Sequence, residues 1–106
     1  MSKFMRLLIF FDLPVTTKKE RAIATQFRNY LIKDGFYMVQ FSVYSRICNT
    51  MESAQLHETR IKKQVPDNGS VRSMIVTEKQ YASMNILVGV PKPKEKNVSV
   101  MQMSFF

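Results

Sequence analysis

The chain has 106 residues, the size of one domain, and its composition excludes a disordered protein and a disulfide-stabilised one. Hydrophobic residues make up 45% and charged residues 23%, and Cys48 is the single cysteine, so no intrachain disulfide can form. Sixteen Lys and Arg against eight Asp and Glu give a net charge of +8, which is typical of a polyphosphate-binding protein. The alternative is a basic surface that binds nothing.

Residues 4–12 are almost continuously apolar and end at Leu13-Pro14. This pattern predicts a central strand that is covered on both faces and stopped by proline. The run is too short to cross a membrane and has no cleavage site of a signal peptide, so we expect a cytoplasmic protein with no membrane partner. Basic residues, Arg6 among them, occur along the whole chain, and we expect the folded surface to display them.

Residues 17–34 have the spacing of an amphipathic helix. Its apolar stripe consists of Ile23, Phe27, Tyr30 and Leu31. Thr17 and Glu20 have the spacing of a capping box, and Gly35 follows as a helix stop.

The following segments predict further strands and a second helix. Residues 36–47 are aromatic and β-branched with a period near two, which predicts one long strand. Residues 51–65 predict a weaker helix that ends at a turn, residues 66–69. Residues 71–77 predict a third strand and residues 85–90 a fourth, after a connector with room for a single helical turn.

We interpret this pattern as an α+β protein of the ferredoxin-like βαββαβ fold, in which both helices cover one face of an antiparallel sheet. The opposite face would be bare and apolar, so we expect a second copy or another partner to cover it. Residues 1–90 would form this domain. Residues 91–106 combine a basic hinge with an additional C-terminal strand, which we expect to dock on the sheet edge of another protomer or another protein.

Asp12 is the acidic residue that stands where a site is expected, at the carboxyl end of the central strand. Two copies of Asp12 across a dimer axis could hold one Mg²⁺, or Mn²⁺, which would activate water against a phosphodiester. The alternative is that Asp12 only accepts hydrogen bonds from the turn that follows.

Basic residues at the start of the first helix are the candidate phosphate contacts. Lys18, Lys19 and Arg21 occupy its first turn, where free N–H groups also attract phosphate. Arg28 and Arg46 would extend this set if the folded chain brings them close. The single histidine, His57, is expected to pack rather than to act as a base, and no zinc or nucleotide-phosphate motif is present.

Several motifs in order resemble the small CRISPR-associated adaptation protein that partners the CRISPR integrase. They are Asp12 after an apolar strand, FRNYLIKDGF in the helix, QFSVYSR, and VTEKQY at residues 76–81, which resembles members from single-effector (type II) systems. The resemblance spans residues 4–90.

The resemblance implies a homodimer with sheets packed face to face, which binds double-stranded prespacer DNA through its phosphates and bridges integrase dimers. Asp12 matches the family aspartate that is proposed to bind a divalent metal in members that cut RNA or DNA, so a metal-dependent endonuclease is the alternative function. A third reading, an RNA-recognition domain, fits poorly because residues 69–76 lack the aromatic side chains that stack on bases.

Overall fold

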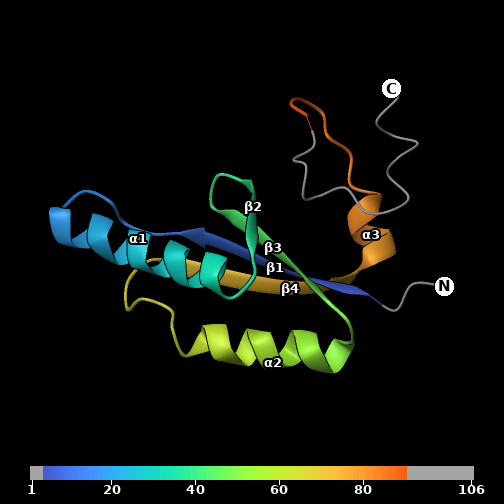
Figure 1. Ribbon diagram of the computed structural model, residues 1–106. Helices are drawn as coiled ribbons and strands as arrows, with labels where there is room; N and C mark the ends of the chain where they lie inside the picture. The colour runs from blue at the N-terminus through green and yellow to red at the C-terminus, as the bar shows by residue number, and fades with distance from the viewer. Residues whose placement is uncertain (1–3, 91–106) are drawn as a thin grey trace.

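The computed structural model describes residues 4–90, which follow the order βαββαβ with one short helix added at the end. The elements are β1 (Met5–Asp12), α1 (Lys18–Lys33), β2 (Tyr37–Gln40), β3 (Val43–Cys48), α2 (Met51–Lys62), β4 (Ser70–Thr77) and α3 (Glu78–Ala82). The strands form one antiparallel sheet in the order β2-β3-β1-β4 (Figure 1). This arrangement confirms the α+β ferredoxin-like fold that the sequence predicts.

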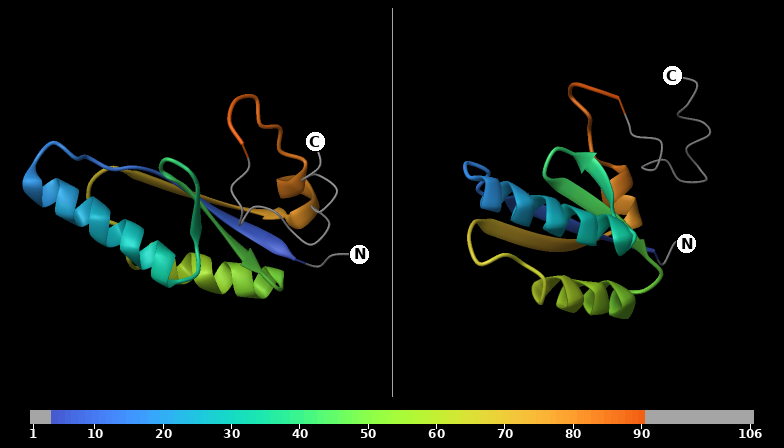
Figure 2. Two further views of the ribbon diagram at one scale, coloured as in Figure 1. Left: turned by 45° about the horizontal axis from the view of Figure 1, so that its top comes forward. Right: turned by 60° about the vertical axis from the view of Figure 1, so that its left-hand side comes forward.

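The hydrophobic core lies between the sheet and helices α1 and α2, which cover the same face (Figure 2). Alternate side chains of β1 point into it, and Leu7 and Ile9 are fully buried there. Phe27 of α1 meets Phe11 edge to face, with 5.3 Å between the ring centroids. The central strand therefore packs its odd-numbered residues against both helices.

Helix α1 begins and ends where its sequence signals predict. The Thr17 side chain accepts a hydrogen bond from the Glu20 backbone N–H, and the Glu20 carboxylate accepts one from the Thr17 N–H. Asp34 is the C-terminal cap, and Gly35 follows with a φ of +100°. Both predicted helix boundaries are thus confirmed.

The single long strand predicted over residues 36–47 is wrong, because this segment folds into the β2–β3 hairpin. Its turn, Phe41-Ser42, contains no glycine, asparagine or proline to mark it. Ser42 instead adopts a φ of +67°, and its carbonyl oxygen accepts a hydrogen bond from the Phe11 N–H of β1 at 3.1 Å. A contact with a distant strand thus stabilises a turn that the local sequence does not favour.

The predicted strand at residues 85–90 is also wrong, since these residues form no strand in the described part of the chain. They belong to an exposed segment, residues 83–90, that we call the arm. A β-strand needs hydrogen bonds to a neighbouring edge, and among residues 4–90 the arm forms no ladder with the edge strand β2, from which a groove of about 590 Å³ separates it. Helix α2 also ends earlier than expected, at Lys62, while the predicted strand of residues 91–106 lies outside the described residues.

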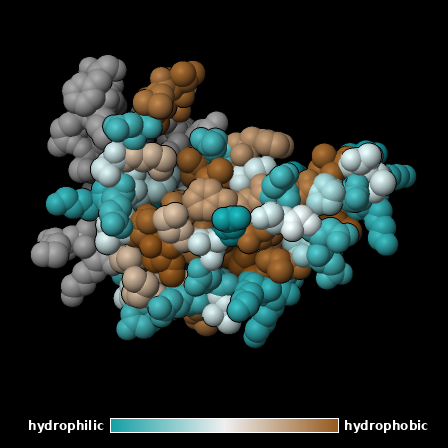
Figure 3. Space-filling view, turned by 180° about the vertical axis from the view of Figure 1, so that it is seen from behind, coloured by the Kyte–Doolittle hydropathy of each residue, from teal (hydrophilic) through white to brown (hydrophobic). Residues whose placement is uncertain are grey.

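The face of the sheet opposite α1 and α2, which we call the open face, is only half bare. It carries the even-numbered side chains of β1, whose exposure rises from Arg6 and Leu8, which are buried, to Asp12, which is exposed. Helix α3 packs at the end where β1 begins and covers that half (Figures 1 and 2). Hydrophobic side chains gather on what remains (Figure 3), and Met74 of β4 is 50% exposed there.

Gly69 allows the turn before β4 to pack against the end of β1, and we expect Gly69→Ala to destabilise the fold. Its φ is +96°, and an added Cβ would lie 2.7 Å from the Asp12 carbonyl oxygen and 2.9 Å from Leu13 Cδ2. Backbone strain and the clash together should lower the free energy of unfolding by about 2 kcal/mol. Urea denaturation measures this loss.

Gly89→Ala is the matched control for Gly69→Ala. Gly89 also has a positive φ, +112°, but the atom nearest to its added Cβ is 3.9 Å away, in an exposed segment. The control should therefore lose less stability. Equal losses would show that the close approach to Asp12 contributes nothing.

Candidate nucleic-acid interface

Asp12 and the basic first turn of α1 lie at the same end of the molecule, joined by the loop of residues 13–17. The Asp12 carboxylate is exposed, and no residue within 4–90 donates a hydrogen bond to it. The alternative assignment, in which Asp12 accepts hydrogen bonds from the following turn, thus finds no support in this part of the chain. The side chain is available to ligands.

Lys18, Lys19 and Arg21 lie together as predicted, but they are not equivalent. The two lysines are exposed and form no ion pair in the described part of the chain. One nitrogen of Arg21, Nη1, donates to the carbonyl oxygens of Val15 and Thr16 at 3.3 and 3.0 Å. Arg21 therefore braces the loop between Asp12 and the lysines, and its remaining N–H groups have no partner among residues 4–90.

Arg28 and Arg46 lie apart from the first-turn lysines and Arg21, next to residues of the hydrophobic core. Arg28 is beside Tyr44, and its charge opposes the rise in pKa that burial causes for that hydroxyl. Arg46 packs at the far end of α1, where Nε donates to the Asp34 carbonyl oxygen at 2.7 Å. The fold does not bring all five basic residues to one point, because α1 separates its two ends by about 20 Å.

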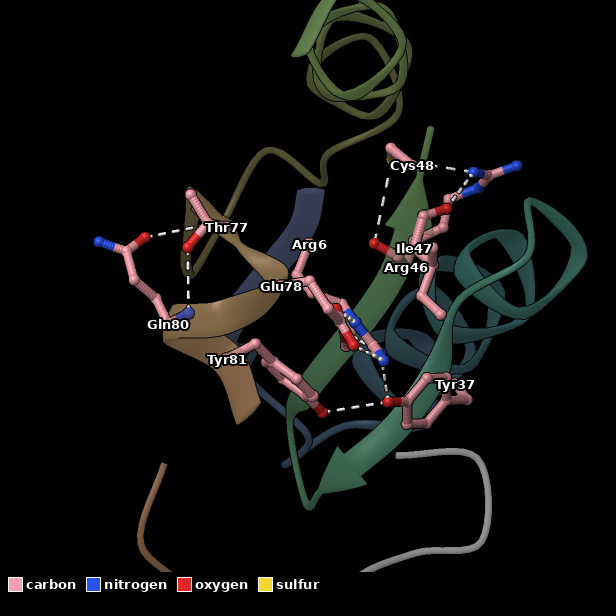
Figure 4. A network of polar contacts seen from close by, with 10 residues as sticks. Arg6, Tyr37, Arg46, Ile47, Cys48, Thr77, Glu78, Gln80 and Tyr81 are labelled. Carbon is pink, nitrogen blue, oxygen red and sulfur yellow. Dashed lines mark hydrogen bonds and ion pairs between the residues drawn. The ribbon is translucent and has the colours of Figure 1, made fainter. Parts of the chain in front are cut away.

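A buried ionic network on the open face was not expected from the sequence. Arg6 is 0% exposed, so the expectation that the surface displays this arginine is wrong. Its Nε and Nη2 donate to the two carboxylate oxygens of Glu78 at 2.6 and 3.1 Å (Figure 4). Nη1 donates to the Tyr37 hydroxyl at 2.6 Å and to Ser45 Oγ at 3.3 Å.

The aromatic rings around Arg6 complete this network. The guanidinium carbon lies 4.2 Å from the ring centroid of Tyr81, and the Tyr81 and Tyr37 hydroxyls are 3.1 Å apart. Burial by itself would lower the pKa of Arg6, but the Glu78 carboxylate and Tyr37 outweigh it and raise that pKa. The signal in the sequence was an arginine inside an apolar strand, which requires a buried acidic partner.

His57 is buried, which agrees with the packing role expected of it. Its Nδ1 lies 2.8 Å from a carboxylate oxygen of Asp34, and Arg60 lies 3.6 Å from the other oxygen. This cluster ties α2 to the end of α1. Among residues 4–90, no three His, Cys, Asp or Glu side chains lie close enough to hold a metal ion, and no helix is long and apolar enough to span a bilayer.

A model of one protein family, described as "CRISPR associated protein Cas2", matches residues 5–84, which run from the start of β1 through α3. The chain belongs to the Cas2 family. The predicted resemblance is therefore confirmed, and its matched region contains Asp12, the basic first turn of α1 and the Arg6 network.

Relatives in the Cas2 family cover nearly the whole chain. One from Acidovorax ebreus (strain TPSY) is 51% identical over 102 residues, 96% of this chain and 100% of the relative. One from Lacticaseibacillus rhamnosus is 48% identical over 93 residues, 88% of this chain and 92% of the relative. Both are named "CRISPR-associated endoribonuclease Cas2".

A solved structure described as "Crystal structure of cas2" has the same fold. It superposes with a TM-score of 0.56, covers 90% of this chain and 98% of its own, and is 20% identical in sequence. At this identity the likeness supports the ferredoxin-like architecture and says nothing of the site.

Raising the pH above the usual pKa of a cysteine thiol should destabilise the protein. Burial raises the pKa of the Cys48 thiol, against the opposing effect of Arg46, and burial likewise raises the pKa of Tyr44. As the pH rises, the unfolded chain therefore releases these protons before the folded chain does. The free energy of unfolding keeps its full value below about pH 8.5 and falls as the pH rises toward the folded-state pKa values.

Urea denaturation at about pH 7 and about pH 9.5 measures this effect. Cys48→Ala removes one of the two groups and should show a smaller loss over the same interval. A loss as large as that of the parent chain would exclude a contribution from Cys48.

Proposed function

We propose that this chain is the dimeric, duplex-DNA-binding scaffold subunit of the CRISPR spacer-acquisition complex. Two copies would hold the phosphate backbone of the prespacer and bridge the integrase dimers. The membership in the Cas2 family supports the link to CRISPR adaptation. The basic residues at the start of α1 support the contact with phosphate.

The observation that carries this proposal is the position of Lys18 and Lys19. Cations at the N-terminus of a helix oppose its dipole, so these two lysines do not stabilise α1. They are exposed beside free first-turn N–H groups, a combination that favours a bound phosphate. Helix stability does not explain two lysines at this position, whereas phosphate binding does.

The other predicted contacts would extend this site along α1. Arg21 would act through the N–H groups that do not brace the loop, and Arg28 lies further along the same helix. Arg46 would reach the same duplex only if the duplex runs parallel to α1, since it packs at the far end of that helix. We therefore rank the first-turn residues above Arg46.

A second copy of the chain would cover the apolar half of the open face. Phe10, Val43 and Met74 are partly or fully exposed there, with Asp12 at the end of the same strand. In the arm, Leu87 and Val88 are 91% and 93% exposed, which a soluble monomer would not favour. Face-to-face pairing would bury the sheet surface and bring both Asp12 side chains toward the dimer axis.

The C-terminal residues would supply a further contact. Residues 91–106 continue from the exposed arm, and we propose that they dock on a partner chain, either the second protomer or the integrase. The free edge of β4 favours such docking, because it pairs only with β1 among the described strands.

Duplex DNA binding should depend steeply on salt, and the double variant Lys18→Gln/Lys19→Gln should weaken both the affinity and that dependence. Losing two phosphate contacts would reduce the slope of log K against log [salt] by about 1.8. Fluorescence anisotropy with a short duplex at several salt concentrations measures the slope. A single-stranded RNA competitor that binds more tightly than the duplex would favour the RNA-recognition alternative.

The matched control is Lys62→Gln/Lys63→Gln at the end of α2. It removes the same charge from another part of the surface. An equal loss of slope in both variants would mean that net charge, rather than a site on α1, determines binding.

The second candidate function is a metal-dependent endonuclease, favoured by the exposed and unpaired Asp12 carboxylate. Relatives bear the name endoribonuclease. Within residues 4–90 of one chain no three His, Cys, Asp or Glu side chains could hold a Mg²⁺ or Mn²⁺ ion, whereas paired Asp12 side chains with bound waters would suffice. The metal would activate water against a phosphodiester, and Asp12 would hold it.

Asp12→Asn should abolish Mg²⁺-dependent cleavage of RNA or duplex DNA while leaving duplex affinity within about twofold, since phosphate contacts supply the affinity. Gel analysis of labelled substrates with Mg²⁺, Mn²⁺ or a chelator measures cleavage, and anisotropy measures binding. Cleavage that persists in Asp12→Asn would assign it to another site or to a contaminant.

A further inference from the structure

The Arg6–Glu78 ion pair occupies a place where an apolar pair would serve stability as well. Arg6 is fully buried in the central strand, and Glu78, at the first position of α3, is buried with it. Burying two charges carries a large desolvation penalty, and apolar residues of similar size often stabilise a fold as well or better. A bidentate pair adds a fixed relative orientation, because two parallel hydrogen bonds hold the carboxylate in one position relative to the guanidinium.

The orientation of helix α3 depends on this ion pair because the helix is only five residues long. A helix of this length has no stability of its own, and the Thr77–Gln80 capping box fixes only its start. The Arg6 pair with Glu78 and the stacking of Arg6 on Tyr81 hold α3 against β1 (Figure 4). The contact between the Tyr81 and Tyr37 hydroxyls holds it toward β2, which fixes the rotation of the helix.

The arm leaves α3 directly, so the same contacts determine where the arm points. It lies beside β2, and a groove of about 590 Å³ separates it from Val39, Gln40 and Phe41. Strands β2 and β4 are at opposite edges of the sheet, so the arm points away from the free edge of its own β4. The apolar side chains of the arm are exposed, Leu87 by 91% and Val88 by 93%, so a second copy can receive them.

We propose that Arg6 and Glu78 are positioning residues for dimerisation: their ion pair holds α3 across the open face and directs the arm toward a second copy of this chain. The inference rests on the homodimer of the proposed function. It assigns the pair a role in association that is separate from folding.

The test compares the parent chain with the double variant Arg6→Met/Glu78→Met. This change keeps the net charge and leaves no unpaired buried charge, but flexible apolar side chains replace the fixed geometry. We expect the urea midpoint of the variant at low concentration to match the parent, while the dimer dissociation constant in sedimentation equilibrium rises by at least about tenfold. Arg6→Lys, which keeps a charge but loses the bidentate geometry, should also weaken the dimer.

Two further variants separate the possible outcomes. Arg60→Gln removes an ion pair on the helix side of the molecule and should leave the dimer unchanged. Leu87→Ser/Val88→Ser changes the arm itself and should weaken the dimer as Arg6→Met/Glu78→Met does.

A monomeric parent chain would refute the proposed dimer. A dimeric parent that is weakened by the arm variant but not by Arg6→Met/Glu78→Met would overturn only the positioning role. A double variant that loses stability and dimer affinity in the same proportion would show that the ion pair is simply structural, which also overturns the inference.

Discussion

A charged side chain inside a protein must be neutralised, and in this chain that constraint shapes half of one face of the sheet. Arg6 lies in the central strand with no access to water, so an acidic group had to reach it. Glu78 does so from the start of α3, 72 residues later in the chain. The helix that carries Glu78 then covers half of a face that would otherwise be bare.

The two ends of β1 differ as a result. At its beginning, the open face is closed by α3 and the Arg6 network; at its end, Asp12 is exposed beside a loop that Arg21 braces and a helix that begins with two lysines. The closed end directs the arm, and the open end gathers negative and positive groups that could meet a metal or phosphate. One strand thus connects the surface proposed for association with the surface proposed for nucleic acid.

The elements that the sequence predicts well are those with a strong local signal. The apolar run of β1, the capping box of α1 and the β-branched residues of β4 each determine their element with little help from elsewhere. The β2–β3 turn has no such signal, because Phe41-Ser42 contains no glycine, asparagine or proline and depends on a hydrogen bond to Phe11. Residues 85–90 failed as a strand for the opposite reason: their β propensity is high, but within residues 4–90 they form no hydrogen-bonded ladder with the edge of β2 beside them.

The candidate site likewise combines features that the local sequence predicts with features that depend on the fold. The sequence by itself determined the family, the excess of positive charge and the position of Asp12 directly before the basic first turn of α1, because these depend on residues near one another in the chain. Only the tertiary structure decided that Arg21 and Arg46 hold backbone carbonyls, that α1 keeps Arg46 far from the lysines, and that Arg6 is buried against Glu78. Ionic partners are selected by distance in space, and a pairing across 72 residues leaves no local pattern from which it could be predicted.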